Sequence, residues 1–410
     1  MYKLFAIIFL VFLSTSIYSS TSISQCLEIN SSYSFDTDRT IVFNQNITSN
    51  DASCIVLDNV SNVTIDCNNY YLIGNTSNSK GFDLSRPNID NISIHNCNIE
   101  DFNSGIHVES QFDLLLSIQN ITLNNISGSI GFGGGAAIYF NSVILTEESV
   151  VRNISIYNSQ EVAVYLVAIL SMKDVRIINS TGQGVISSGS YINLSDFTIQ
   201  NTHDEAIRLT NMRDSIFNSI SITDSESGFY ILDSKNIIIN NSYISNTSIY
   251  GIEFEDLIGD KFENITVSNT VIRDSFRGLR VPANTVNPSE VYVYGNTFVN
   301  NTDYNLLVLS ETHPGLDIYI YNNTLGNISK IDVPSSTSNT IYFNLSTVGN
   351  VYYNTSIYSG VLCFTPVICD NQAQVTLFPV VSQVLEQTSS SLFPFTSAIS
   401  LFLVVIYFLF

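Results

Sequence analysis

Asp204 and Glu226 are the two residues whose types and spacing best suit chemistry on a sugar chain. Each stands two residues before the start of a short repeated phrase. Regular stacking of such repeats would place the two carboxylates on adjacent strands, about 4.8 Å apart, which is near the spacing of paired carboxylates in retaining glycosidases. Arg208 follows closely and would supply the base that a polysaccharide lyase needs. These three residues are the catalytic candidates, and the simpler alternative is that they are solvated turn residues.

A second candidate surface consists of the residues two places after each phrase start. Strand alternation turns them outward if the neighbouring Ile, Val and Leu point inward. Tyrosine rings in such a row can stack on sugars, while Arg and Glu can bind hydroxyl or carboxylate groups. The ligand-binding candidates are Tyr139, Tyr165, Arg208, Tyr230, Glu253 and Arg280. The alternative is that the row only stabilises the sheet through cross-strand pairs.

The phrases that position these groups recur nine times between Gly105 and Asn305, each as a small or turn-forming residue before a short apolar-alternating run. They begin at Gly105, Ala137, Ala163, Gly184, Ala206, Gly228, Gly251, Gly278 and Asn305. Most of the intervals are about 21 to 27 residues, which lies within the range of solenoid repeats. This interval is too short for a βαβ unit of roughly 30 or more residues.

A second phrase precedes the first by about a dozen residues and has the same period. It alternates apolar with polar residues and is rich in Ile, Val and Thr, as half-buried strands are. Its copies begin at Asn62, Asn91, Asn120, Asn153, Asp174, Ser195, Asn236 and Asn264. Each period therefore predicts two or three short strands separated by turns. That is one coil of a parallel β-helix, which buries its inward side chains against the neighbouring coils.

These repeats resemble the right-handed parallel β-helix repeats of pectate-lyase-like proteins, and in particular predicted carbohydrate-binding and sugar-hydrolysing proteins of archaeal cell surfaces. The segment 54–57 followed by 62–69 is similar to the opening coil of those surface proteins, with Asn69 where they usually have Gly. The resemblance covers roughly residues 54–353 and implies an all-β, right-handed parallel β-helix solenoid. It does not choose a function, because this fold carries enzymes, adhesins and tail spikes alike.

The two ends of the chain predict export and a membrane anchor. A short charged start, the apolar run Leu4–Leu13 and a small polar region are typical of a signal peptide, predicted over 1–19. No charge follows Glu386, and residues 392–410 form an apolar tail close to the roughly 20 residues that span a bilayer. We predict a C-terminal transmembrane helix there, with a processed lipid-anchor signal as the alternative.

The domain boundaries follow from these segments. Residues 20–52 are predicted to form N-terminal cap strands, residues 53–361 the right-handed parallel β-helix, and residues 362–391 a stalk or linker. The net charge of −21 comes with only 12% charged residues, so Asn, Ser and Thr must provide solubility. An acidic chain without basic clusters excludes nucleic acid as a partner.

Six cysteines agree with export, because an even number in an exported protein suggests disulfides. Cys363 and Cys369 flank a short loop and are expected to pair. For the other four, the preferred connectivity is Cys54–Cys67 with Cys26–Cys97, although spacing alone cannot select it. The cysteines lack the paired spacing of a zinc site and the four His residues are scattered, so no metal site is predicted.

Asn-x-Ser/Thr glycosylation sequons are dense along the chain. Part of this density is structural. The strand phrase Asn-Ile-Ser-Ile alternates polar with apolar residues, as a half-buried β-strand does, and this alternation itself contains a sequon. An Asn buried in a turn ladder cannot also carry a glycan. The glycosylation candidates are Asn46, Asn75, Asn179, Asn246, Asn327 and Asn354.

The sequence favours an exported, membrane-anchored glycoprotein on the extracellular face of the cell membrane, with a structural, adhesive or glycan-binding role. Its expected partners are the membrane, polysaccharide and neighbouring surface proteins. The alternative is a carbohydrate-active enzyme, either a polysaccharide lyase or a glycoside hydrolase, acting on the outward face of the β-helix. No cofactor is predicted, and Ca²⁺ is expected only if the protein is an enzyme.

Overall fold

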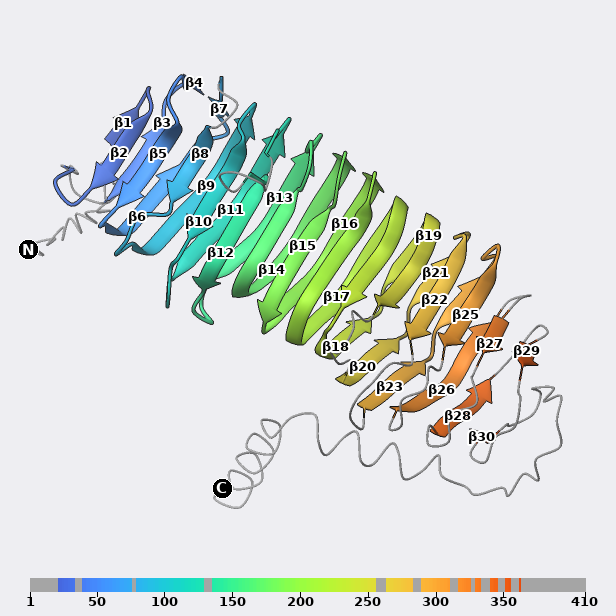
Figure 1. Ribbon diagram of the computed structural model, residues 1–410. Helices are drawn as coiled ribbons and strands as arrows, with labels where there is room; N and C mark the ends of the chain where they lie inside the picture. Colours follow the sequence, from blue (N-terminus) through green and yellow to red (C-terminus); the bar gives the residue numbers. More distant parts are fainter. Residues whose placement is uncertain are drawn as a thin grey trace, which may run out of the picture. The chain divides into compact units, whose positions relative to one another are not determined.

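The computed structural model describes residues 21–33, 39–75, 79–128, 135–255, 263–282, 289–309, 316–325, 329–332, 340–345, 351–354 and 361–362. The predicted signal peptide and membrane anchor lie outside these residues, as does the predicted stalk apart from Leu362. Among the residues described, no helix is long and apolar enough to cross a membrane. The described part consists of thirty β-strands joined into one continuous parallel sheet that coils around a core (Figure 1).

Each coil has up to three faces, which the chain visits in the same order. Face 1 contains β2 (Leu27–Asn30), β5 (Ser53–Asp58), β8 (Lys80–Leu84), β10 (Ser104–Glu109), β12 (Ile138–Ile144), β15 (Val185–Ser190), β22 (Arg277–Pro282), β25 (Tyr304–Leu309), β27 (Ser329–Asp332) and β29 (Val351–Asn354). Face 2 contains β1 (Thr21–Ile23), β3 (Thr40–Phe43), β6 (Ser61–Asp66), β18 (Lys235–Asn240), β20 (Glu263–Ser268), β23 (Ser289–Tyr294), β28 (Thr340–Leu345) and β30 (Val361–Leu362). Face 3 contains β4 (Ile47–Thr48), β7 (Tyr71–Ile73), β21 (Val271–Arg273) and β24 (Thr297–Val299).

Longer strands bend at the corners and contribute to more than one face. They are β9 (Asp90–Glu100), β11 (Leu116–Asn124), β13 (Val150–Tyr157), β14 (Val164–Ser180), β16 (Ile192–Thr202), β17 (Glu205–Leu232), β19 (Tyr243–Glu255) and β26 (Leu316–Leu325). The chain runs from face 1 to face 2 and then to face 3 before the next coil begins. The cap strands β1 and β2 pair with β3 and β5 and so continue the same stack.

The register on face 1 is the one that the first repeated phrase predicts. Ile106 pairs with Ile138, Ile138 with Val164, and Val164 with Val185. Farther along the stack, Ile252 pairs with Leu279 and Leu279 with Leu306. The phrases therefore form one ladder of equivalent strands.

The copies of the second phrase lie on two different faces of the coil. Its copies at Asn62 and Asn91 open strands of face 2, where Val63 pairs with Ile92. The copies from Asn120 to Ser195 open strands of face 3, where Ile121 pairs with Ile154. Those at Asn236 and Asn264 lie on face 2 again. Both faces start after a turn residue and both alternate in burial, so the same local signature fits either one.

The core is a continuous column of buried Ile, Leu, Val and Phe side chains. Small residues begin most face 1 phrases, because the packing leaves no room for a larger side chain at these positions. A Cβ on Gly228 would lie 2.3 Å from the carbonyl oxygen of Gly251 and 2.7 Å from a methyl group of Ile244 on face 3. At Gly184 the corresponding contacts are 2.5 Å to the carbonyl oxygen of Ala206 and 3.0 Å to Ile199.

The corners are made by single residues in the left-handed conformation, mostly Asn and Asp, which tolerate positive φ better than other side chains. Between faces 2 and 3, Asn96, Asn120 and Asn153 have φ values of 57°, 57° and 54°. Their side chains form a ladder along the stack. Asn120 Nδ2 donates to Asn96 Oδ1 at 3.0 Å, and Asn153 Nδ2 donates to Asn120 Oδ1 at 2.6 Å.

Two disulfides tie the N-terminal coils together, but not in the preferred connectivity. The bonds are Cys26–Cys54 and Cys67–Cys97, with Cα–Cα distances of 4.5 and 4.8 Å. The predicted pairs Cys54–Cys67 and Cys26–Cys97 are therefore wrong. Stacking places equivalent positions of adjacent coils side by side, and the separations of 28 and 30 residues are about one coil. The expected Cys363–Cys369 pair lies outside the described residues.

Replacing Asn153 tests the corner ladder. Asn153→Ala removes the bond to Asn120 and places Ala in the left-handed region, so we expect it to lower the free energy of unfolding by about 2 kcal/mol. Asn153→Gly loses the same bond but accepts the backbone conformation, so its cost should be smaller. The urea midpoint measures both. The control is Asn193→Ala on the exposed side of β16, which should change the urea midpoint little. An equal loss of stability from the alanine variants of Asn153 and Asn193 would contradict the role of the ladder.

Candidate functional site

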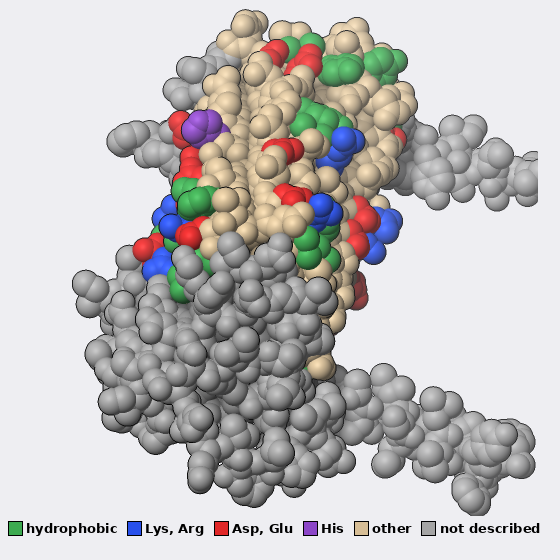
Figure 2. Space-filling view, turned by 90° about the vertical axis from the view of Figure 1, so that its right-hand side faces the viewer, with side chains coloured by type: hydrophobic (Ala, Val, Ile, Leu, Met, Phe, Trp, Pro, Cys, Tyr) green, Lys and Arg blue, Asp and Glu red, His purple; other side chains and the backbone are tan. Residues whose placement is uncertain are grey.

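The outward side of face 1 carries the predicted ligand-binding row, and the structure brings its members together as neighbours. Tyr139 pairs with both His107 and Tyr165 in register, and Tyr230 pairs with Glu253, which pairs with Arg280. Seen from one side, the described surface consists mostly of uncharged polar side chains and backbone, with hydrophobic, acidic and basic groups interspersed (Figure 2).

The N-terminal half of the row is an aromatic stack. The rings of His107 and Tyr139 lie 4.6 Å apart at 10°, and those of Tyr139 and Tyr165 lie 4.9 Å apart at 9°. His107 and Tyr139 are only 2% and 8% exposed, and burial lowers the pKa of the His107 imidazole, which favours its neutral form. Because the faces of these rings are covered by one another, the N-terminal half of the row contributes mainly to the stability of the sheet.

The C-terminal half of the row combines guanidinium groups with tyrosine rings. Arg208 lies over the ring of Tyr230, 5.3 Å from its centroid, and pairs with Glu205 at 3.6 Å. The Tyr230 hydroxyl donates to the carboxylate of Glu255. Gln183 Nε2 donates to the other side of the Glu205 carboxylate at 3.2 Å. Arg208 is therefore held by one acid and one ring.

Two further arginines continue the pattern. Arg280 forms an ion pair with Glu253 and lies 5.9 Å from the ring centroid of Tyr250. Arg277 lies 5.1 Å from the same centroid, donates to the Tyr250 hydroxyl at 2.8 Å and pairs with Asp303 at 3.0 Å. We call Arg208, Tyr230, Tyr250, Arg277 and Arg280 the arginine–tyrosine strip.

Sequence reasoning missed several members of this surface. Glu205, Tyr250 and Arg277 stand one residue before a phrase start, at Ala206, Gly251 and Gly278, and this position also faces outward. The repeat carries a signal for this position, because a phrase start turned toward the core directs the preceding residue outward. That residue is partly exposed at Glu205, Tyr250 and Arg277 but buried at Ala136 and Val162.

The catalytic candidates are adjacent, as the repeat predicts. The backbone N–H of Glu226 donates to the carbonyl oxygen of Asp204 at 3.1 Å, so the two residues occupy equivalent places in neighbouring coils. Burial, followed by the charges of Glu205 and Asp204, raises the pKa of Glu226. A raised carboxyl pKa suits a general acid. Arg208 contacts Glu205 and Tyr230, and no described contact joins it to Asp204 or Glu226.

Within the described ranges, no group of three or more His, Cys, Asp or Glu side chains has the arrangement to hold a metal ion.

The glycosylation candidates fall in different settings. Asn46 and Asn75 are exposed, and each forms one hydrogen bond, to the Tyr71 backbone N–H and the Asn50 side chain respectively. Asn179 and Asn246 are left-handed corner residues between faces 3 and 1, with φ values of 59° and 55°. Asn179 bonds to both coil neighbours, and Asn246 donates to Asp224. Asn327 and the side chain of Asn354 lie outside the described residues.

Comparison with known proteins agrees with this fold. Residues 154–325 match the family model described as Right handed beta helix region, which confirms the predicted right-handed parallel β-helix for this part of the chain. A search of curated proteins finds no relative.

Several solved structures are similar at low sequence identity. One is the A-module of the Azotobacter vinelandii mannuronan C-5 epimerase AlgE6, with a TM-score of 0.45 and 12% identity, covering 80% of this chain and 91% of the epimerase module. Another is the catalytic domain of a GH87 alpha-1,3-glucanase, with a TM-score of 0.41 and 14% identity, covering 80% and 62% of the two chains. A third is the Dettilon tailspike protein, with a TM-score of 0.33 and 12% identity, covering 82% and 61%.

The raised pKa of Glu226 gives a pH-dependent prediction. The folded state favours the protonated carboxyl, so its contribution to stability is full below the unfolded pKa, near 4.3, and is lost as pH rises through the folded value. Glu226→Gln cannot ionise and should therefore raise the urea midpoint at pH 7 relative to the unchanged chain. The gain should shrink as the pH is lowered through the folded pKa and should be absent below about 4. A gain of the same size at both pH values would contradict the shift.

Proposed function

We propose that the protein is an exported, membrane-anchored glycoprotein of the cell surface that binds polysaccharide on the outward side of face 1. The observation that carries this proposal is the arginine–tyrosine strip. In it, three guanidinium groups lie over tyrosine rings and are each paired with a carboxylate.

The strip has the chemistry that a sugar chain requires. Side-chain exposures of 37% for Arg208, 30% for Arg277 and 25% for Arg280 leave part of each guanidinium open to a ligand. Each guanidinium has five N–H donors in a fixed fork, so donors remain beyond those used by the paired carboxylate. Tyrosine combines an apolar ring with a polar hydroxyl, which matches the amphipathic surface of a pyranose.

The charge balance of the strip supports the same proposal. The chain as a whole carries a net charge of −21 and has only 15 basic residues. Three of these basic residues lie in the strip, where each is matched by one acid. Glu255, which accepts a hydrogen bond from Tyr230, adds a fourth acid. An acidic polysaccharide approaching this surface would therefore meet nearly balanced charge, with less repulsion than is expected elsewhere.

Export and anchoring rest on separate observations. The apolar run Leu4–Leu13 and the uncharged tail 392–410 carry the expectation of a signal peptide and a membrane anchor. The disulfides Cys26–Cys54 and Cys67–Cys97 support an oxidising compartment outside the cytosol. Exposed sequon residues such as Asn46 and Asn75 are the favoured positions for glycans.

Substitution of the strip tests the binding proposal. We expect the full-length chain to be retarded in gels containing polysaccharide, and Arg208→Ala combined with Arg280→Ala to weaken that retention about tenfold or more. The reason is that the double variant removes two cationic donors and leaves Glu205 and Glu253 unpaired. Tyr243→Ala, an exposed tyrosine on face 3, is the matched control and should behave like the unchanged chain. Equal retention of all three proteins would contradict binding at the strip.

A second candidate function is a carbohydrate-active enzyme that uses Asp204 and Glu226. The observations that favour it are their adjacency in neighbouring coils and the raised pKa of Glu226. A lyase acting on a uronate would also need a positive charge, from Arg208 or from Ca²⁺, to neutralise the substrate carboxylate.

A product assay decides between the two functions. The full-length chain would be incubated with Ca²⁺ and a panel of neutral and acidic polysaccharides, and the release of reducing ends or unsaturated uronates would be measured. If the enzyme function is correct, Glu226→Gln should lower the rate at least about 100-fold, the usual contribution of a general acid. Absence of product, with retention on the same polysaccharides, would leave binding as the function.

A further inference from the structure

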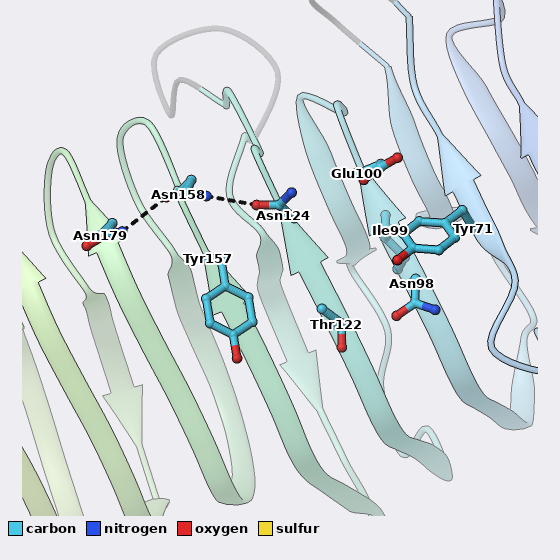
Figure 3. Close-up of a pocket in the computed structure, with 9 residues that line it drawn as sticks. All are labelled: Tyr71, Asn98, Ile99, Glu100, Thr122, Asn124, Tyr157, Asn158 and Asn179. Atoms are coloured by element: carbon cyan, nitrogen blue, oxygen red, sulfur yellow. Dashed lines mark hydrogen bonds between the residues drawn. The ribbon is translucent and has the colours of Figure 1, made fainter.

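A hollow of about 320 Å³ lies on the outward side of face 3, away from the strip (Figure 3). Tyr71 of β7 and Tyr157 of β13 stand on opposite sides of it, and the strands between them carry Asn98, Thr122 and Asn124. All five side chains point outward from the core, because the intervening residues of these strands are buried.

The register explains why the surface is hollow here. Tyr71 pairs with Asn98 and Asn98 with Thr122, while Asn124 pairs with Tyr157. The two tyrosines are therefore three coils apart, about 14 Å along the stack. Shorter side chains fill the outward positions between them. The result is a polar floor with a tyrosine at each end, long enough for several sugar rings in line.

The floor offers both donors and acceptors. Asn98 Nδ2 donates to the carbonyl oxygen of Asn69 at 2.6 Å, which leaves its side-chain oxygen as an acceptor. Asn124 Oδ1 accepts a bond from Asn158 at 2.9 Å, which leaves its amide N–H groups as donors. The Thr122 hydroxyl has no protein partner among the described residues and can serve in either role. Neighbouring hydroxyls on a sugar ring likewise donate and accept.

The electrostatics select against acidic ligands. Glu100 is the one charged residue among those that line the hollow in the described part of the chain. Burial, followed by the charge of Asp101, raises the pKa of this carboxyl. Because no Lys or Arg is among the described residues that line the hollow, nothing there would offset the repulsion between Glu100 and a uronate or sulfate group.

We propose that this hollow binds a short, unbranched, neutral oligosaccharide, with Tyr71 and Tyr157 contacting sugar rings at the two ends and Asn98, Thr122 and Asn124 binding hydroxyls between them. The site shares no residue with the arginine–tyrosine strip and goes beyond the proposed function. The protein therefore has two carbohydrate surfaces of different selectivity.

Calorimetric titration of the full-length chain tests this inference. The probes are cellopentaose, laminaripentaose and maltopentaose, with pentagalacturonic acid as the charged counterpart. We expect at least one neutral pentasaccharide to bind, and the galacturonate to bind at least about tenfold more weakly at this site. Tyr71→Ala and Tyr157→Ala should each weaken neutral binding about tenfold or more. Tyr243→Ala, another exposed tyrosine of face 3, should not.

Glu100→Gln is expected to increase the affinity for the charged ligand. An increase in affinity cannot be explained by loss of folding. The variant should keep neutral binding and bring the affinity for the galacturonate close to that for the neutral chains. The urea midpoint of each variant confirms that it is folded. The inference is overturned if no neutral pentasaccharide binds at millimolar concentration, if both tyrosine variants bind as the unchanged chain does, or if Glu100→Gln leaves the preference unchanged.

The strip variant separates the two sites. Arg208→Ala combined with Arg280→Ala should leave neutral pentasaccharide binding intact. Loss of that binding in the strip variant, with no effect of Tyr71→Ala or Tyr157→Ala, would refute the hollow and leave the strip as the binding surface. The reverse result would establish the hollow and would not bear on the strip, which the retention on polysaccharide gels tests separately.

Discussion

Parallel pairing between successive coils is the constraint on which the other features of this structure depend. A backbone buried on its inner side must pair its N–H and C=O groups, and here each strand pairs with the equivalent strand of the next coil. A side chain therefore has the residue one period away as its neighbour. Sequence repetition becomes spatial contact, and any residue type that recurs in the repeat forms a row along the stack.

The rows show what this constraint does with different side chains. Asn at the corners forms hydrogen-bonded ladders, as in Asn96, Asn120 and Asn153. Tyrosines stack on one another, as in Tyr292 on Tyr319 and Tyr294 on Tyr321. Cysteines one coil apart become disulfides. Where the repeat changes from aromatic to charged residues, as at Arg208 and Tyr230, guanidinium groups lie over tyrosine rings and remain partly exposed.

The two candidate binding surfaces differ because their rows differ in charge. On face 1, Arg208, Arg277 and Arg280 bring positive charge to an acidic protein, and each is balanced by an acid. On face 3, the row between Tyr71 and Tyr157 is neutral apart from Glu100. A regular scaffold can thus carry rows of different charge, because each face varies its outward residues independently while the inward residues form the core.

The β-helix, the register of face 1 and the adjacency of Asp204 and Glu226 could be predicted from the sequence, because all three follow from one local period. The disulfide partners could not, because the bonds depend on which positions stack in the folded coils and not on proximity along the chain. Only the tertiary structure assigned the second phrase to two faces, because strands of both faces share one burial pattern. The hollow between Tyr71 and Tyr157 joins side chains from different coils and rows, so no periodic signal in the sequence indicates it.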